Sequence, residues 1–231
     1  MKAYCITLKD NEYSKNAAVR CIASAVMVGV DVQAFHATPA ERAEKVMEYY
    51  GLKWTWANGN TENAICPFTG LKQHPYKTHD FRMRVGCAMS HYRLWRECAS
   101  MGETILILEH DTVFLRPLPR IEECYGAIML NDPAGATPRG EWWAQKIANK
   151  GTGIHGKTTV FPEHEMRPDG LAGGSAYIIT PLAAMACIQA YQQLGVWPND
   201  ATLCRQLVGG LQECYPFVTR VQPDKSMAGG Y

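Results

Sequence analysis

The sequence predicts an α/β protein built around a mostly parallel sheet. Residues 3–8 form a short apolar run that predicts a first strand, and this run ends in a polar turn. Apolar residues then recur at helical spacing over residues 15–27, and residues 30–35 alternate like a second strand. A strand, a helix and a strand in this order are the opening of an open α/β sheet.

Residues 104–108 are the third observation that favours this fold. They are continuously apolar and β-branched at several positions, which is typical of a strand buried on both faces of a parallel sheet. Apolar residues at helical spacing predict a helix over residues 86–98, and Gly102 ends it. We therefore expect residues 104–108 to be the central strand.

Glycine, proline and periodicity place the remaining elements. Residues 51–80 have no steady period and predict a long surface excursion. Further loops at residues 131–139 and 150–174 flank a helix that carries Trp142 and Trp143. The rest of the chain predicts a strand, two helices and a short final strand, at residues 175–180, 181–192, 201–207 and beyond Pro216.

Composition and charge limit the class of protein. The whole chain, residues 1–231, is expected to form a single domain, because one hydrophobic core still serves this length. Apolar residues make up 47% and charged residues 19%, as in globular proteins. The formal net charge of +1 gives no general field for nucleic acid or an anionic bilayer. A nucleic-acid role would need a local basic patch.

Neither export nor membrane insertion is expected. Residues 1–10 contain too few apolar residues in a row for a signal-peptide core. The longest apolar stretches, residues 21–30 and 105–108, are far shorter than the roughly 20 residues that cross a bilayer. The nine cysteines form no CxxC pair, and this spacing suits neither zinc nor a disulfide framework. We expect reduced core thiols in a cytoplasmic protein with no transmembrane segment.

Two acids at the end of the expected central strand are the strongest candidates for chemistry. Side chains alternate along a strand, so Glu109 and Asp111 are expected on one side and His110 on the other. Open α/β sheets bind ligands beyond the carboxyl ends of their strands. Mg²⁺ or Mn²⁺ is commonly held by one or two carboxylates together with substrate phosphates. The alternative is that the two acids only mark the exit of the strand into solvent.

A particular helix precedes these acids. It reads Gly86-Cys87-Ala88-Met89-Ser90-His91, and Trp95 and then Ile105-Leu106-Ile107-Leu108-Glu109-His110-Asp111 and Phe114 follow. This combination resembles glycosyltransferase family 25, which includes lipopolysaccharide-synthesis galactosyltransferases. That family has a Gly-Cys-Ala-x-Ser-His helix and a strand ending in Leu-Glu-Asp-Asp, so His110 replaces the middle Asp. Residues 173–181 are similar more weakly, with Ala176 in place of a usual Gly, and residues 51–80 and 135–169 match no part of the pattern.

The resemblance implies a fold and a set of site residues. The fold is the GT-A type, a Rossmann-like single domain in which the first strand and its loop hold the nucleotide of a sugar donor. Glu109 and Asp111 would hold Mn²⁺ or Mg²⁺, and Asp200 in Trp197-Pro198-Asn199-Asp200 would take the proton of the acceptor. The residues expected to contact the donor are Leu8, Lys9, Arg20, Arg84, Ser90, His91 and Glu109.

Several of these roles have structural alternatives. Arg20 is equally consistent with a solvated charge on the first helix, and Ser90 and His91 with hydrogen bonds to core groups. Asp200 is also a natural N-cap for a helix at residues 201–207, and it can serve as both cap and base. His110 either adds a nitrogen ligand to the metal or faces away.

Other polar and aromatic residues are weaker candidates. His155, Lys157 and His164 are either metal or diphosphate contacts or ordinary surface residues. Trp142 and Trp143 either stack on a sugar or base or anchor their loop. A final candidate is the tail, where Lys225 and Ser226 resemble the family's terminal segment and would close on the pyrophosphate.

Together with this resemblance, the residues predict a metal-assisted enzyme that transfers a hexose from a UDP-sugar to a hydroxyl acceptor such as a glycan. The resemblance alone implies that the transfer proceeds with inversion. A protein of the same fold that binds the nucleotide without turnover is one alternative. Transfer to a hydroxylated nucleic-acid base is another, along a groove lined by Lys53, Lys72, Lys77, Arg82 and Arg84. A dehydrogenase is disfavoured, because no Gly-x-Gly-x-x-Gly follows the first strand.

Overall fold

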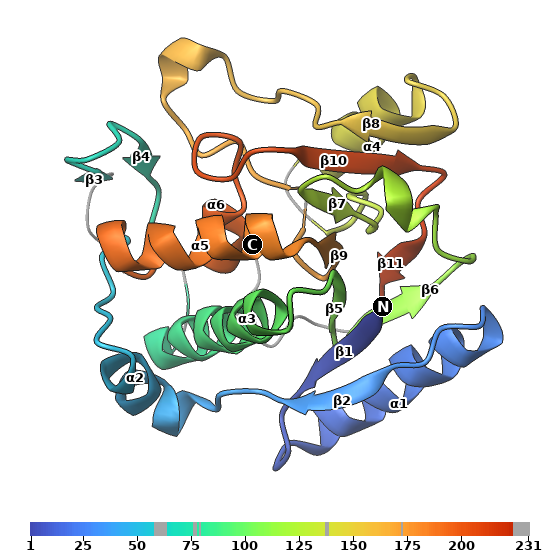
Figure 1. The fold of residues 1–231 in the computed structure, drawn as a ribbon, viewed down its shortest axis with the longest axis horizontal. Helices are drawn as coiled ribbons and strands as arrows, with labels where there is room; N and C mark the ends of the chain where they lie inside the picture. Colours follow the sequence, from blue (N-terminus) through green and yellow to red (C-terminus); the bar gives the residue numbers. More distant parts are fainter. Residues whose placement is uncertain (58–63, 76–77, 79, 137–138, 172, 224–231) are drawn as a thin grey trace.

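The computed structural model describes residues 1–57, 64–75, 78, 80–136, 139–171 and 173–223. In these residues a seven-stranded sheet runs through the molecule in the order β2-β1-β5-β9-β7-β10-β8 (Figure 1). Its strands are β1 Lys2–Thr7, β2 Gln33–His36, β5 Ile105–Glu109, β7 Ala127–Met129, β8 Gly153–Gly156, β9 Ala176–Ile179 and β10 Leu211–Tyr215. All of them except β8 and β9 point in the same direction. The predicted α/β class with a mostly parallel sheet is confirmed.

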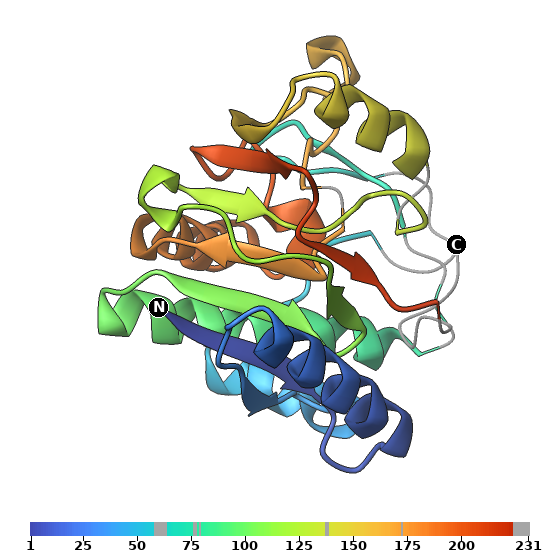
Figure 2. The same ribbon diagram turned by 90° about the vertical axis from the view of Figure 1, so that its right-hand side faces the viewer.

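Helices cover both faces of this sheet. On one face α3 (Phe81–Met101) and α5 (Pro181–Leu194) pack together, with α2 (Ala40–Tyr49) beyond α3. The other face is covered by α1 (Glu12–Met27), as Figure 2 shows. The central strand divides its side chains accordingly, with Ile105 and Ile107 in the core beneath α3 and Leu106 and Leu108 in the core beneath α1. Burial on both faces is what its continuously apolar sequence predicts.

Capping residues fix the ends of the long helices. The Asp80 side chain accepts a hydrogen bond from a backbone N–H of the first turn of α3, so this helix begins before its apolar period does. It ends at Gly102, which adopts the left-handed conformation with φ of 66°. Thr180 caps α5 in the same way as Asp80, and Pro181 occupies the first helical position.

Three expectations about local structure are corrected. The helix expected at residues 201–207 is a single turn, α6 (Asn199–Thr202), because it begins after Pro198 and Leu203 leaves helical geometry with ψ of 59°. The loop expected at 150–174 contains β8, which pairs antiparallel with β10. The 51–80 excursion contains the short hairpin of β3 (Ala64–Ile65) and β4 (Lys72–Gln73).

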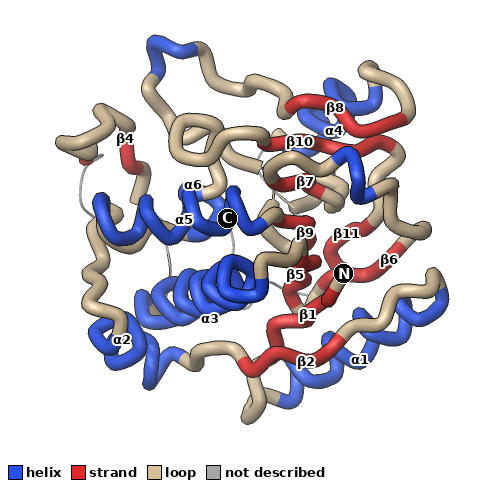
Figure 3. Tube along the Cα trace, viewed as in Figure 1, coloured by secondary structure: helices blue, strands red, loops and turns tan. Residues whose placement is uncertain are grey.

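Two buried acids anchor α4 (Gly140–Ala148) and the segment between α4 and β9, which is mostly loop (Figure 3). Asp169 accepts a hydrogen bond from Lys157 Nζ at 2.7 Å, and neither side chain is more than 3% exposed. Glu213 of β10 accepts from Trp143 Nε1 at 3.2 Å. The Lys157–Asp169 pair therefore ties the segment to itself, and Trp143 joins α4 to β10. Thr158 joins the segment to the sheet, because its N–H and hydroxyl donate to Glu213 Oε2 at 2.9 and 2.8 Å. These contacts favour the structural interpretation of Lys157 and Trp143.

All nine cysteines are free thiols, in agreement with the expectation of reduced cysteines. The part of the chain described here contains no helix long and apolar enough to cross a membrane.

Candidate active site

The carboxyl ends of β1 and β5 meet at one edge of the sheet. The two strands are parallel, and Ile6 lies opposite Glu109. Leu8 and Lys9 continue the chain beyond β1 at the edge where β5 ends in Glu109. The Leu8 N–H donates to Ser14 Oγ at 2.9 Å, and Lys9 is exposed. This edge is where an α/β sheet binds its ligands.

The acidic segment is a turn rather than a continuation of the strand. β5 ends at Glu109, and a tight turn at His110 and Asp111 leads directly into β6 (Thr112–Phe114). The expected alternation over residues 107–111 therefore stops at Glu109. The two acids nevertheless lie close enough that the charge of Glu109 shifts the pKa of Asp111.

The carboxyl group of Asp111 is buried beside a second carboxylate. Its Oδ1 has no hydrogen-bond partner among the described residues. Burial, with a further contribution from the negative charge of Glu109, raises the pKa of Asp111 from 3.8 to about 7. An unpartnered carboxylate oxygen next to another carboxylate is the donor set that Mg²⁺ and Mn²⁺ prefer. The side chains of Glu109 and Asp111 therefore fit a divalent cation.

Glu109 is held by a buried histidine. Its Oε1 lies 3.2 Å from His91 Nε2, and the Glu109 side chain is 30% exposed. Burial alone would raise the pKa of Glu109, but the hydrogen bond and the charge interaction with His91, followed by the charges of His110 and Arg84, bring it below the ordinary value of 4.5. Glu109 is thus the ionised member of the pair near neutral pH. The effect of Arg84 on the pKa of Glu109 also indicates that Arg84 lies close to the site.

His110 faces α1. Its ring packs edge-on against Tyr13, with centroids 6.1 Å apart and planes at 88°. Burial lowers the pKa of His110, although the negative charge of Glu109 and a hydrogen bond to the backbone of Ile6 oppose this shift. These contacts give His110 a structural role, in which its side chain packs against α1.

Gln222 holds the acidic turn from the side of α1, and no pattern in the sequence pointed to it. Its backbone N–H donates to the Asp111 carbonyl at 2.7 Å, and its Nε2 donates to the carbonyls of His110 and Thr112, each at 3.3 Å. Gln222 Oε1 accepts from Arg20 Nε at 2.6 Å. Arg20 therefore lies beside the turn and is tied to it through Gln222.

The Gly-Cys-Ala-x-Ser-His part of α3 packs tightly against the loop after β2. A Cβ atom at Gly86 would come within 2.5 Å of the Thr38 carbonyl oxygen, so only glycine permits this approach. Ser90 Oγ donates to the Gly86 carbonyl at 2.7 Å and accepts from the Thr38 N–H at 2.8 Å. The Ser90 hydroxyl thus has the core partners that were the alternative to donor binding.

His91 is fully buried and joins the acid to the core. Its Nδ1 lies 2.8 Å from Tyr177 Oη, and the same oxygen accepts from Trp95 Nε1 at 2.9 Å. Three side chains behind Glu109 are therefore linked in one series of hydrogen bonds. Tyr177 lies on β9 and was not singled out from the sequence.

Asp200 approaches the same site from α6. Burial first, and then the negative charges of Glu109, Asp200 and Asp111, raise the pKa of the Cys87 thiol well above its ordinary value of 9.0. The Cys87 Sγ contacts Glu109 Oε1 at 3.9 Å and Asn199 Oδ1, the neighbour of Asp200, at 3.5 Å. Asp200 is not an N-cap, since Pro198 has that position. Its Oδ1 accepts from the N–H of the next residue at 3.0 Å.

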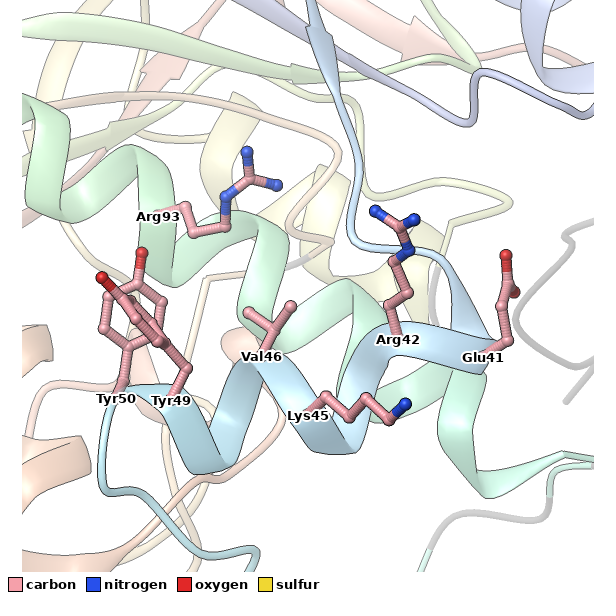
Figure 4. A pocket seen from close by; sticks show the side chains of 7 residues that line it. All are labelled: Glu41, Arg42, Lys45, Val46, Tyr49, Tyr50 and Arg93. Carbon is pink, nitrogen blue, oxygen red and sulfur yellow. The ribbon is translucent and has the colours of Figure 1, made fainter.

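A surface hollow of about 600 Å³ lies elsewhere, along α2 and α3 (Figure 4). Its lining residues are Glu41, Arg42, Lys45, Val46, Tyr49, Tyr50 and Arg93. None of them belongs to the acidic turn or α6, so the hollow is separate from the site. His155 also lies elsewhere, on β8, with its Nε2 bonded to the Gly151 carbonyl. The tail residues Lys225 and Ser226, and Lys77 of the suggested nucleic-acid groove, fall outside the described residues.

Comparison with known protein families identifies the family of this chain. The model of glycosyltransferase family 25, described as an LPS biosynthesis protein family, matches residues 1–131. The chain belongs to glycosyltransferase family 25. A search of curated proteins finds no match.

The family match covers β1, α3 and the acidic turn, and therefore most of the residues at the sheet edge. Tyr177, Asp200 and Gln222 lie beyond the matched part of this family 25 protein. The fold brings them to the same place through β9, α6 and the segment after β11 (Thr219–Val221). Membership of the family implies a glycosyltransferase, with a sugar donor and an acceptor.

Proposed function

We propose that this family 25 protein transfers a hexose from a UDP-sugar to a hydroxyl acceptor such as a glycan, with inversion, in a GT-A type site. The observation that supports this most strongly is that Cys87 contacts Glu109 at the end of β5 and Asn199 of α6, while the charges of Glu109, Asp200 and Asp111 all act on its thiol. Two of these acids suit a cation on the donor, and the third suits a proton acceptor for the incoming hydroxyl.

Glu109 and Asp111 would hold Mn²⁺ or Mg²⁺. Such an ion supplies positive charge that stabilises the diphosphate leaving group. The chain itself contributes an ionised Glu109, whose pKa is lowered, and an Asp111 that becomes ionised near pH 7. The free Oδ1 of Asp111 is the atom that most needs such a partner.

The donor is expected along the edge formed by the chain after β1. Leu8 and Lys9 flank the base and ribose in this proposal, and Arg84 stands near the phosphates because it acts electrostatically on Glu109. Arg20 lies farther from the acidic turn, because its hydrogen bond is to Gln222, which itself contacts the turn. Lys9 and Arg84 thereby bring positive charge to a donor that carries two phosphate groups.

Asp200 is the proposed base. In an inverting transfer the acceptor oxygen attacks C1 of the sugar while its proton passes to a carboxylate, and the bond from C1 to the UDP oxygen breaks. Asp200 lies on α6, whose Asn199 contacts Cys87, so the base and the metal-binding acids belong to different elements. This separation suits two different tasks in one reaction.

Incubation with radiolabelled UDP-glucose and UDP-galactose tests the proposal. Sugar release or transfer should require Mn²⁺ or Mg²⁺ and should be lost in Asp111→Ala. Turnover that is unaffected by EDTA and by Asp111→Ala would contradict the metal role. Binding of UDP without turnover of any donor and acceptor would identify a nucleotide-binding protein, and label transferred to hydroxymethylated DNA would identify a nucleic-acid acceptor.

A further inference from the structure

The hydrogen bonds behind Glu109 form a series whose direction can be assigned. Trp95 Nε1 lies 2.9 Å from Tyr177 Oη, Tyr177 Oη lies 2.8 Å from His91 Nδ1, and His91 Nε2 lies 3.2 Å from Glu109 Oε1. Trp95, Tyr177 and His91 are all 0% exposed. Water therefore does not compete for these groups, and each proton must be placed within the series.

The indole group fixes the first step. An indole N–H only donates, so Tyr177 Oη accepts from Trp95. Burial raises the pKa of Tyr177 well above 10.0, so the phenol keeps its own proton. The second hydrogen bond of Tyr177 is to His91 Nδ1, and that nitrogen must accept it. In this arrangement the ring proton lies on Nε2, which donates to Glu109 Oε1.

We propose that Trp95, Tyr177 and His91 form a one-way chain of hydrogen bonds that sets the orientation of the Glu109 carboxylate. His91 and Tyr177 are thus positioning residues for the proposed cation site. The role of Glu109 as a cation ligand rests on the proposed function, whereas the direction of these hydrogen bonds does not. Fixing Oε1 leaves Oε2, which accepts no hydrogen bond within the described residues, for the cation.

This assignment also decides a competing possibility for His91. Cys87 Sγ, His91 Nε2 and a Glu109 carboxylate oxygen lie within 4.8 Å of one another, which suits a zinc site by distance. In the observed arrangement, however, His91 Nε2 lies 3.2 Å from Glu109 Oε1 and is already engaged in a hydrogen bond with that carboxylate. The geometry therefore favours His91 as a partner of Glu109.

The direction of the chain is tested without reference to activity. Two-bond ¹H–¹⁵N correlation spectra of the ¹⁵N-labelled protein distinguish the two neutral imidazole tautomers and the imidazolium, and loss of one signal set in His91→Gln assigns His91. We expect the Nε2–H tautomer at neutral pH in the metal-free wild type. A proton on Nδ1, in either the neutral or the charged form, would overturn the proposal.

The positioning role is tested with matched variants. Tyr177→Phe removes the hydroxyl that orients His91, and Tyr191→Phe is the control, because Tyr191 is equally buried and donates to the Trp197 carbonyl at 2.7 Å. Both should lower the melting temperature by similar amounts. Only Tyr177→Phe should weaken Mn²⁺ binding in the presence of UDP, by about 10–100-fold in calorimetric titration, as the loss of groups that orient metal ligands does elsewhere.

A second pair of variants separates orientation from folding. His91→Gln keeps a donor for Glu109 and should retain more Mn²⁺ affinity than His91→Leu. Equal Mn²⁺ affinities in Tyr177→Phe and Tyr191→Phe would overturn the positioning role. If the wild type binds neither Mn²⁺ nor UDP, the proposed function fails, and the positioning role fails with it, whereas the tautomer still decides the direction of the chain.

Discussion

Replacing Asp111 with Asn is expected to stabilise the metal-free protein at high pH while removing a cation ligand. Asp111 is buried beside Glu109 with an unpartnered Oδ1, and its pKa is raised from 3.8 to about 7. The folded state therefore binds the Asp111 proton more tightly than the unfolded state does. Stability contributed at this position is present below pH 4 and is lost as pH rises towards 7.

The size of the effect follows from this pKa. A change of one in pKa corresponds to 1.36 kcal/mol, so the rise from 3.8 to about 7 costs about 4 kcal/mol once Asp111 is ionised in both states. At pH 5 only about 1.5 kcal/mol of this cost is present. The stability of Asp111→Asn relative to wild type should therefore increase by about 2.5 kcal/mol between pH 5 and pH 8.

Urea denaturation at both pH values in EDTA measures this difference. Any constant effect of the amide on packing cancels when the two pH values are compared. Asp10→Asn is the control, because Asp10 is exposed and lies beyond the same sheet edge after β1. With Mn²⁺ and UDP the order should reverse, since only wild type gains from binding. A stability difference that does not grow from pH 5 to pH 8 would refute the reasoning.

Three further predictions concern other residues. Asp200→Asn should lower kcat by about 10²–10⁴-fold while UDP binding in calorimetry stays unchanged, and an unaffected kcat would remove Asp200 as the base. Gln222→Leu should lower the free energy of unfolding by about 1–3 kcal/mol, because it leaves buried carbonyls of the acidic turn unpaired, and urea denaturation would show no change if the turn did not depend on it. Gly86→Ala should cost about 1–3 kcal/mol from its clash with Thr38, whereas Gly209→Ala, with nothing within 4 Å, should cost much less in the same assay.

The strongly periodic parts of the fold could be predicted because the spacing of their apolar residues shows which side chains are buried. The strands at residues 3–8 and 104–108 and the helix at residues 86–98 all exist, with ends moved by caps such as Asp80. Strands β7, β8 and β10 could not be found in this way. They are only three to five residues long, and β8 contains two glycines, so pairing with neighbours rather than local pattern makes them strands.

The candidate site divides in the same way. Glu109 and Asp111 could be predicted because they follow the most apolar strand, and His91 because it interrupts the packed face of a helix. Tyr177 and Gln222 could not, because they contact the site from positions 86 and 110 residues away in sequence from His91 and Thr112. Only the assembled sheet shows that a tyrosine of β9 and a glutamine after β11 belong to the same edge.

The melting temperature with and without Mn²⁺, across a panel of nucleotide-sugars, tests the central claim most directly. We predict that a UDP-hexose raises the melting temperature of the wild type only when Mn²⁺ or Mg²⁺ is present, and that Glu109→Gln loses this metal-dependent part. Stabilisation by a UDP-hexose that is equal in EDTA and in Mn²⁺, or the absence of stabilisation by every nucleotide-sugar, would contradict a metal-assisted donor site at Glu109 and Asp111.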